Sequence, residues 1–304
     1  MRSSRALRTV ALGAVVAGFA APLVRRRLKL RPVVVSALAW QAPVAMAIAT
    51  PRSALRDAAI YGLQMWAYLA HYEMPNDDHE RLLERLHVTY PIRADNVLGL
   101  GTPPTVRLQR SLGEPGRVFP HDLALAGIHW SWFMVPHGTV AYILLRRREQ
   151  FPRAAAMMAA VFDAGVVVYW LLPTAPPWWA GSNGHMVHVR RIMVEAGEHF
   201  WGRAWKPLYD FLGGNPFAAM PSLHFATSVM AAHVLSDVGP LPGTAGWVYA
   251  ISLGFALVYL GEHYAADLLA GLVLAEGVRA IAPRAERALL PLARAVQRLE
   301  PGAA

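Results

Sequence analysis

The sequence predicts an all-α protein, a polytopic membrane helix bundle, and three observations support this fold class. The chain has 304 residues, of which 55% are hydrophobic and 16% charged, and its mean hydropathy is +0.30. Soluble domains carry about 25% charged residues. The apolar residues gather in runs of about the 20 residues that a helix needs to cross a bilayer, and the charges lie between these runs. We therefore expect six core transmembrane helices.

The six predicted spans follow from the apolar runs in chain order. They cover residues 33–50, 122–145, 154–173, 218–237, 244–261 and 265–282. An earlier apolar run, residues 9–24, has a basic start and small residues, which fits a signal peptide or a seventh helix. Three arginines at 25–27 follow it directly, with another span behind them. This order favours the additional helix over a cleaved signal peptide.

A long polar and aromatic segment, residues 51–120, separates the first two core spans. Its part from Leu55 to Tyr72 is predicted to be a helix that lies along the membrane interface. The Pro-Asn-Asp-Asp-His run at 75–79 fits a solvated turn or a divalent-ion site, and composition favours the turn. The end of the chain, residues 283–304, is predicted to be a basic amphipathic tail on the inner membrane surface.

Three regions follow from these patterns. Residues 1–120 hold the N-terminal membrane helices and the outer interfacial insertion, residues 121–282 form a membrane core, and residues 283–304 form the cytoplasmic tail. The absence of cysteine excludes a disulfide framework, a thiol nucleophile and a thiolate metal site.

The net charge of +9 does not indicate nucleic-acid binding, because the arginines border the apolar runs. Arginines in this position set the orientation of the chain and contact anionic lipid heads. Residues 146–153 and the tail after Arg279 are then cytoplasmic, and alternation places residues 174–217 outside. We expect an integral protein of the plasma (inner) membrane, with both histidines of the motifs described next facing the extracytoplasmic side.

Two motifs suggest the chemistry. Pro221-Ser222-Leu223-His224 opens one apolar run, and His263-Tyr264-Ala265-Ala266-Asp267 opens another. Residues 263 and 267 share a helix face, so the carboxylate can hold the imidazole in one tautomer. A lone histidine at a helix end is usually a polar residue that reaches toward water, but these motifs occur together. If the two helices pack side by side, one imidazole can attack phosphorus while the other protonates the departing oxygen.

At these residues the chain resembles the type 2 phosphatidic acid phosphatase superfamily, whose motifs have the forms Pro-Ser-x-His and His-x-x-x-Asp. The resemblance implies that His263 is the nucleophile, that Asp267 orients it, and that His224 is the general acid. Four strings bring the chain nearer to the inositol phosphorylceramide synthase branch, over about residues 100–280: Pro176-Pro177-Trp178, Arg191-Ile192, Phe217 to His224 and Tyr259 to Asp267.

The chain departs from the superfamily at two phosphate-clamping positions, a gap that the synthase branch shares. The first motif, Lys-x6-Arg-Pro, is missing, and Leu257 stands where an arginine precedes the third motif. Arg191 and Ser222 are our predicted phosphate-binding residues, with Arg190 beside Arg191 and Lys206 as a weaker candidate. Arginine fits paired phosphate oxygens through its planar fork. We also expect backbone N–H groups at the helix N-termini to share this charge.

The remaining polar candidates carry less information. His185, His188, Glu195, Glu198 and His199 lack the His-Glu-x-x-His spacing of zinc hydrolases, so we predict no metal and no cofactor. Arg107 and His137 can approach the site from other helices, although no spacing supports either residue.

The sequence therefore predicts a membrane phosphotransferase, inositolphosphotransferase-like, that acts on lipid-linked phosphate through a phosphohistidine. Its expected partners are a lipid phosphate or phospholipid donor, a polar or lipid alcohol acceptor and membrane lipids, with no nucleic acid. With water as the acceptor, the same scaffold is a lipid phosphate phosphatase. A transporter or a non-enzymatic scaffold is the alternative of another class. A transporter favours repeats or paired interrupted helices, and the sequence displays neither.

Overall fold

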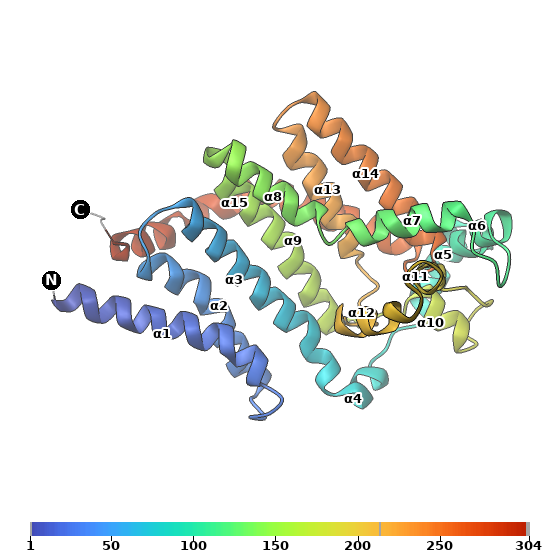
Figure 1. The fold of residues 1–304 in the computed structure, drawn as a ribbon, viewed down its shortest axis with the longest axis horizontal. Helices are drawn as coiled ribbons and strands as arrows, with labels where there is room; N and C mark the ends of the chain where they lie inside the picture. The colour runs from blue at the N-terminus through green and yellow to red at the C-terminus, as the bar shows by residue number, and fades with distance from the viewer. Residues whose placement is uncertain (1, 213, 302–304) are drawn as a thin grey trace. The chain divides into compact units, whose positions relative to one another are not determined.

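The computed structural model describes residues 2–212 and 214–301, and this part of the chain is helical, without a β-strand (Figure 1). The predicted all-α fold class is confirmed. The helices form two compact units. The first comprises Met1–Asp77, Ala141–Ala159 and Val278–Ala304, and the second comprises Asp78–Val140 and Ala160–Gly277. Three helices run from one unit into the other: α8 (Val135–Arg146), α9 (Phe151–Leu171) and α15 (Ala265–Leu299).

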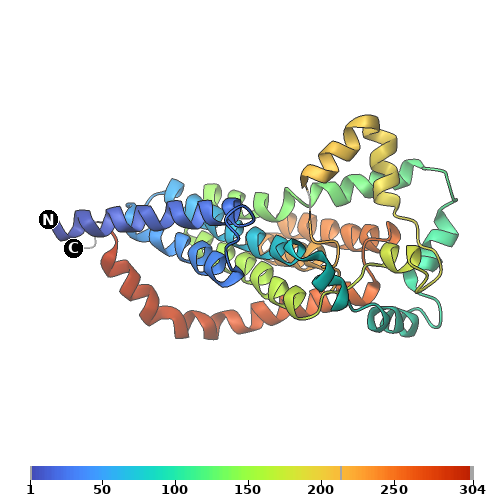
Figure 2. The ribbon, with the colours of Figure 1, turned by 90° about the horizontal axis from the view of Figure 1, so that it is seen from below.

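In the first unit, α1 (Arg2–Val24), α2 (Pro32–Ala49) and α3 (Ala54–Glu73) pack side by side, as Figures 1 and 2 both show. Ser53 caps α3, because its hydroxyl accepts a hydrogen bond from the Arg56 N–H at 3.1 Å. The helix predicted from Leu55 to Tyr72 is therefore present.

The acidic run at 75–79 is occupied by interactions within the protein. Asp77 forms ion pairs with Arg25, at 2.9 Å, and with Arg26, at 2.5 Å, within the short helix η1 (Met74–Asp77). Asp78 caps α4 (His79–Glu84) by accepting a hydrogen bond from the Arg81 N–H. These contacts support a structural turn at this place.

The second unit contains the motifs found in the sequence. Its α-helices lying wholly inside the unit are α4, α5 (Thr89–Leu98), α6 (Pro104–Leu112), α7 (Pro120–Ser131), α10 (Pro177–Ser182), α11 (Ile192–Trp201), α12 (Trp205–Leu212), α13 (Leu223–Ser236) and α14 (Pro240–Tyr259). α13 and α14 pack as a pair, α14 also packs on α6 and α7, and α11 packs on α7 (Figure 1).

Four helical segments in the described part of the chain are long and apolar enough to cross a membrane: Arg5–Val24, Pro32–Ala49, Arg148–Leu171 and Pro240–Tyr259. They match the predicted spans at 9–24, 33–50, 154–173 and 244–261. α13 is apolar but has only 14 residues, because it begins after Pro221 rather than at residue 218. These segments indicate an integral membrane protein.

The span predicted at 122–145 is wrong as one continuous helix. α7 ends at Ser131, and α8 begins at Val135. Pro136 explains the break, since it has no N–H to donate to the carbonyl of Trp132 and its ring crowds that carbonyl. The chain turns there through tighter bonds, from the Trp132 N–H to the His129 carbonyl at 3.1 Å and from the Met134 N–H to the Ser131 carbonyl at 2.9 Å.

The C-terminal region also differs from the expectation. We expected a span over 265–282 and a separate amphipathic tail, whereas α15 runs without interruption from Ala265 to Leu299 (red in Figure 2). Pro283 and Pro291 lie inside this helix. Glu300 just beyond it forms an ion pair with Arg56 of the same unit at 3.2 Å.

Candidate active site

The structure brings the two predicted histidines into direct contact. His224 lies in the first turn of α13, and His263 lies just before α15. The distance between His224 Nδ1 and His263 Nε2 is 3.1 Å, and His263 Nδ1 lies 3.2 Å from Asp267 Oδ2. His263 is 4% exposed and Asp267 is fully buried. The carboxylate thus fixes one ring nitrogen of His263 and leaves the other directed at His224.

The turn that carries His224 is fixed by short polar contacts. The Ser222 hydroxyl accepts a hydrogen bond from the Phe225 N–H at 3.3 Å and caps α13. Tyr169 of α9 holds the same turn from the side. Its hydroxyl donates to the Pro221 carbonyl at 2.7 Å and accepts from the Leu223 N–H at 3.3 Å. His224 therefore starts its helix in a defined direction.

The turn that carries His263 depends on Gly261. This residue has a φ of +84°, which side chains disfavour, and an added Cβ would lie 2.4 Å from the Arg190 carbonyl oxygen. After the turn, Asp267 Oδ2 also accepts the Tyr264 N–H at 2.9 Å. The Ser222 N–H donates to the Asp267 carbonyl at 3.0 Å and joins the two motifs.

Residues of the 51–120 segment hold this second turn from outside, which sequence reasoning missed. Asp95 of α5 is fully buried and accepts the Ala266 N–H at 2.8 Å and the Ala265 N–H at 3.2 Å. Gln109 of α6 donates to the Tyr259 carbonyl at 2.9 Å. We call Asp95 and Gln109 the outer clamp. No spacing in the sequence pointed to them, because the backbone groups that they hold lie over a hundred residues away.

The carboxylates of Asp95 and Asp267 correct one expectation for the start of α15. We expected backbone N–H groups at the helix N-termini to hold the phosphate. The Tyr264, Ala265 and Ala266 N–H groups at the start of α15 are already bound to the carboxylates of Asp267 and Asp95. These groups are not free to bind an anion, so side chains must carry more of the charge.

The Asp95 contact leads to a prediction. Replacing Asp95 with asparagine puts an amide donor opposite a backbone donor, and a mispaired buried group costs roughly 1–3 kcal/mol. We expect turnover to fall about tenfold at unchanged substrate binding, since only the His263 turn is loosened. Measurement of kcat and KM checks this, with Asp210→Asn, on the exposed pair with Lys206, as the matched control. Unchanged turnover in Asp95→Asn would remove the clamp's role.

The contribution of Asp95 to the stability of the fold should also depend on pH. Burial raises its pKa from the ordinary 3.8 to about 6, although the Ala266 and Ala265 N–H groups act in the opposite direction. Because the folded pKa exceeds the unfolded one, the contribution of Asp95 to stability is complete below pH 3.8 and is lost as the pH rises through about 6. The Tm of the wild type, relative to that of Asp95→Asn, should therefore fall between pH 5 and pH 7.5. A shift the other way would contradict this assignment.

An aromatic wall beside His224 was also missed. The Trp132 ring lies 4.2 Å from the His224 ring, centroid to centroid, and its Nε1 donates to the Thr227 hydroxyl at 2.9 Å. The His129 ring lies 5.1 Å from the His224 ring, and its buried Nδ1 has no hydrogen-bond partner in the described structure. Trp132 lies in the interruption between α7 and α8, and His129 lies in the last turn of α7. In the sequence, Pro136 was the residue that could have predicted the break between α7 and α8.

Arg191, a predicted phosphate-binding residue, lies next to the site through Glu262. Its Nε donates to Glu262 Oε1 at 2.9 Å, and its Nη2 donates to Oε2 at 3.2 Å. The guanidinium also lies 3.9 Å from the centroid of the Trp178 ring. Glu262, which directly precedes His263, was not singled out in the sequence. It places Arg191 beside the nucleophile candidate.

The other candidates lie in different surroundings. Lys206 pairs with Asp210 at 2.6 Å and is 83% exposed. Arg107 donates to the Gly99 carbonyl at 2.5 Å, and the His137 ring stacks on Phe162 at 5.5 Å. Within residues 2–212 and 214–301, no group of three or more His, Asp or Glu side chains is arranged to hold a metal ion.

Comparisons with known proteins fit this geometry. A profile of the PAP2 superfamily, the superfamily that the two histidine motifs resemble, matches residues 92–281. The chain belongs to the PAP2 superfamily. The matched residues include both histidines, Asp267, Arg191 and the outer clamp. The helices α1 to α3 lie outside the match.

Two curated proteins are similar in sequence to part of this PAP2 protein. It is 29% identical over 119 residues to the inositol phosphorylceramide synthase catalytic subunit of Schizosaccharomyces pombe, covering 36% of this chain and 28% of that protein. It is 30% identical over 164 residues to the phosphoinositol dihydroceramide synthase of Bacteroides thetaiotaomicron, covering 48% of this chain and 51% of that protein. The matches thus span at most about half of either relative. The comparison with solved structures found no match.

Proposed function

We propose that this PAP2 protein is a membrane phosphotransferase that acts on lipid-linked phosphate through a phosphohistidine. One observation carries the proposal: the buried Asp267 holds His263 Nδ1, while His263 Nε2 faces His224 at 3.1 Å. An imidazole held at one nitrogen and opposed by a second imidazole has the parts needed for nucleophilic attack and for protonation of a leaving group.

The reaction proceeds in two balanced steps. A phosphorus atom between the rings replaces the His224–His263 hydrogen bond, and His263 Nε2 forms the P–N bond as the P–O bond to the leaving alcohol breaks. His224 gives its proton to the departing oxygen. An acceptor hydroxyl then attacks phosphorus and loses its proton to His224, and the P–N bond breaks. Asp267 stabilises the positive charge that His263 acquires.

Arg191 is proposed to stabilise the negative phosphoryl oxygens. Glu262 engages its Nε and Nη2 and so fixes the plane of the guanidinium, whose remaining N–H groups can face the substrate. Ser222 stays a predicted phosphate ligand. Its Oγ accepts a bond from Phe225 while the hydroxyl hydrogen can still be donated. With the first amides of α15 occupied, Arg191 supplies the positive charge and Ser222 supplies a hydrogen bond to the phosphoryl oxygens.

The names of the relatives favour transfer over hydrolysis, and one experiment separates the two. The purified protein in detergent would be given a panel of lipid phosphates and phosphodiesters with inositol, glycerol or a ceramide as acceptor. We expect a new phosphoester of one acceptor. Free phosphate alone across the whole acceptor panel would instead support a lipid phosphate phosphatase on the same scaffold.

The proposed orientation, with the histidines on the extracytoplasmic side of the plasma (inner) membrane, gives a separate prediction. Cysteines introduced at Ser182 in α10 and at Gly239 before α14 would be the only cysteines in the chain. A membrane-impermeant maleimide should label the Ser182→Cys variant in intact cells, and should label Gly239→Cys only after the cells are opened. The opposite pattern would place the histidines on the cytoplasmic side.

A further inference from the structure

A second feature of this unit is a helical hairpin formed by α11, the short helix η3 (Gly202–Ala204) and α12. In Figure 2 this hairpin, coloured yellow to gold, stands out from the other helices of its unit. Two glycines close it. Gly202 turns the chain with a φ of +54°, and Gly197 lets the ring of Trp205 lie against α11, because an added Cβ would come within 2.2 Å of that ring.

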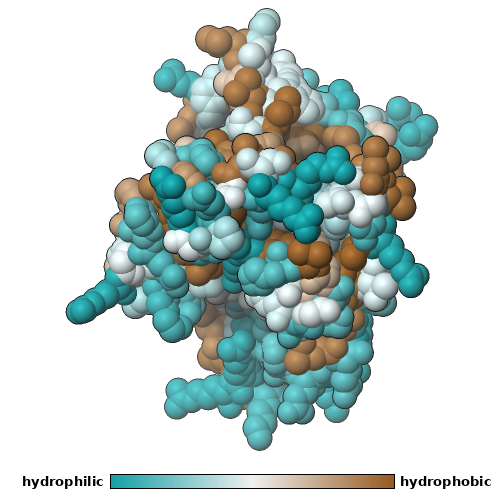
Figure 3. All heavy atoms as spheres, turned by 90° about the vertical axis from the view of Figure 1, so that its right-hand side faces the viewer, coloured by the Kyte–Doolittle hydropathy of each residue, from teal (hydrophilic) through white to brown (hydrophobic). Residues whose placement is uncertain are grey.

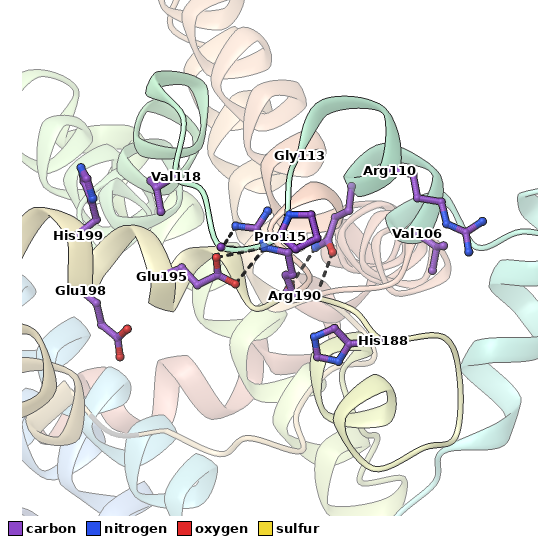
Figure 4. Close-up of a pocket in the computed structure, with 12 residues that line it drawn as sticks. Val106, Arg110, Gly113, Pro115, Val118, His188, Arg190, Glu195, Glu198 and His199 are labelled. Atoms are coloured by element: carbon purple, nitrogen blue, oxygen red, sulfur yellow. Dashed lines mark hydrogen bonds and ion pairs between the residues drawn. The ribbon is translucent and has the colours of Figure 1, made fainter.

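One side of α11 is polar and borders a cavity. Glu195, Glu198 and His199 line this cavity, which has a volume of about 810 Å³ and lies between α6 and α11 (Figure 4). Hydrophilic side chains cover much of the face on which α6, α10 and α11 lie (Figure 3). This side of the hairpin therefore suits contact with water.

The tip of the hairpin, Phe200 to Arg203, has a different character. Phe200 is 62% exposed and Trp201 is 46% exposed, and the centroids of their rings lie 5.1 Å apart. Arg203, on the other side of the Gly202 turn, is an exposed cation. Exposed aromatic rings next to a cation are typical of segments that lie among lipid headgroups.

The base of the hairpin is attached to the end of a membrane-spanning segment. The Ile192 N–H at the start of α11 donates to the Leu260 carbonyl at 3.1 Å. Trp205 of α12 is buried in a cluster with Ala256 and Leu260. These two residues belong to the last turn of the segment Pro240–Tyr259 or follow it directly. Since a spanning helix ends near the headgroups, the hairpin starts at that depth.

We propose that the tip of the hairpin docks into the phospholipid headgroup region of the membrane that the spans cross. The rings of Phe200 and Trp201 enter between the headgroups, and the guanidinium of Arg203 meets the lipid phosphates. The polar side of α11 stays in water. The depth of the base favours lipid over a soluble protein as the partner of this surface.

The same hairpin contacts a residue of the candidate active site. The Arg191 guanidinium carbon lies 5.3 Å from the centroid of the Tyr209 ring of α12, within the range of a cation–π contact. Tyr209 in turn contacts Trp205, with 5.5 Å between the ring centroids. A tip held in the headgroups therefore keeps Tyr209 against Arg191, so Tyr209 is a positioning residue. This consequence rests on the proposed function, whereas the lipid contact does not.

Labelling in a bilayer tests the lipid contact without any chemistry. The chain has no cysteine, so Trp201→Cys, Arg203→Cys and the control Ser182→Cys, at an exposed residue of α10, can each carry a single bimane label. The full chain is placed in nanodiscs that contain a phospholipid with a nitroxide on its headgroup. We expect both tip labels to lose most of their fluorescence, whereas the label at 182 should be quenched mainly by iodide in the water.

Two results would overturn the lipid contact. The first is quenching of both tip labels by iodide and not by the nitroxide lipid. The second is protection of both labels from either quencher, which would indicate contact with a second copy of the chain.

Removal of the rings tests whether they hold the tip in place. Phe200→Ser combined with Trp201→Ser should abolish nitroxide quenching of the label at Arg203→Cys. Val97→Ser, at a residue of α5 that is 75% exposed, is the matched control and should leave the quenching as it is. Nitroxide quenching that survives the loss of both rings would contradict the proposed docking.

The link to Arg191 has its own test. Tyr209→Leu should lower turnover about tenfold, as expected for the loss of a cation–π contact at a partly buried guanidinium. Tyr209→Phe, which keeps the ring, should lose less, and the lipid quenching at the tip should stay the same in both variants. Unchanged turnover in Tyr209→Leu would overturn the link. Lipid quenching at the tip of a wild type that transfers no phosphate would count against the proposed function alone.

Discussion

The His263→Ala variant is expected to lose turnover on lipid phosphoesters by about 10⁴-fold or more, because it removes the atom that bonds phosphorus in the proposed mechanism. His263 is held between Asp267 and His224 at 3.2 and 3.1 Å, and another side chain cannot take its place without rebuilding the turn. Steady-state turnover and trapping of a radiolabelled phosphoenzyme measure the effect. The control is His185→Ala, since the ring of His185 stacks on Trp179 and takes no part in the proposed mechanism.

The Asp267→Asn variant should keep a small residual activity. The amide can still hold the ring of His263, but it cannot stabilise the charged imidazole or keep the correct tautomer. The expected order of activity is wild type, then Asp267→Asn, then His263→Ala. Near-normal turnover in His263→Ala would remove the nucleophile and the proposed mechanism with it.

The His224→Ala variant is expected to discriminate between leaving groups. A general acid contributes about 10²–10⁴-fold, and it matters most when an alkoxide departs. Turnover of a lipid phosphoester should therefore fall by about that factor, whereas an activated aryl phosphate ester, whose leaving group needs no proton, should lose much less. The two substrates are compared on the same variant preparation, so a folding defect affects both equally.

Equal losses on the two substrates would deny His224 the role of general acid. Trp132→Phe provides a useful comparison, because it keeps an aromatic ring near His224 but removes the hydrogen bond to Thr227. It should affect both substrates alike, since it changes the packing of His224 and not its proton.

The histidine pair and the helix class could be predicted because both depend on local information. Residues 263 and 267 are one helical turn apart, and Pro221 and Ser222 mark where α13 begins. Apolar runs of sufficient length likewise predict α2, α9 and α14 directly.

The rest of the site depends on contacts that no local pattern encodes. Asp95 reaches the amide of a residue 171 positions away, and Gln109 reaches a carbonyl 150 positions away. Trp132 lies 4.2 Å from the His224 ring and sits in the break before α8, whereas the hydropathy of residues 122–145 predicts one continuous helix. The position of Pro136 was readable in the sequence, but the side chain that the break would turn toward His224 was not.

The outer clamp has a consequence for how the protein is made. Chains fold broadly from the N-terminus during synthesis, so α5 and α6 exist well before the segment from Tyr259 to Ala266 leaves the ribosome. Gln109 and Asp95 cannot form these hydrogen bonds until Tyr259 and Ala266, which lie 150 and 171 positions later, have been synthesised. Contacts across so long a sequence separation form slowly. His263, the proposed nucleophile, is therefore set in place only near the end of biosynthesis, and an incomplete chain in the membrane lacks the proposed site.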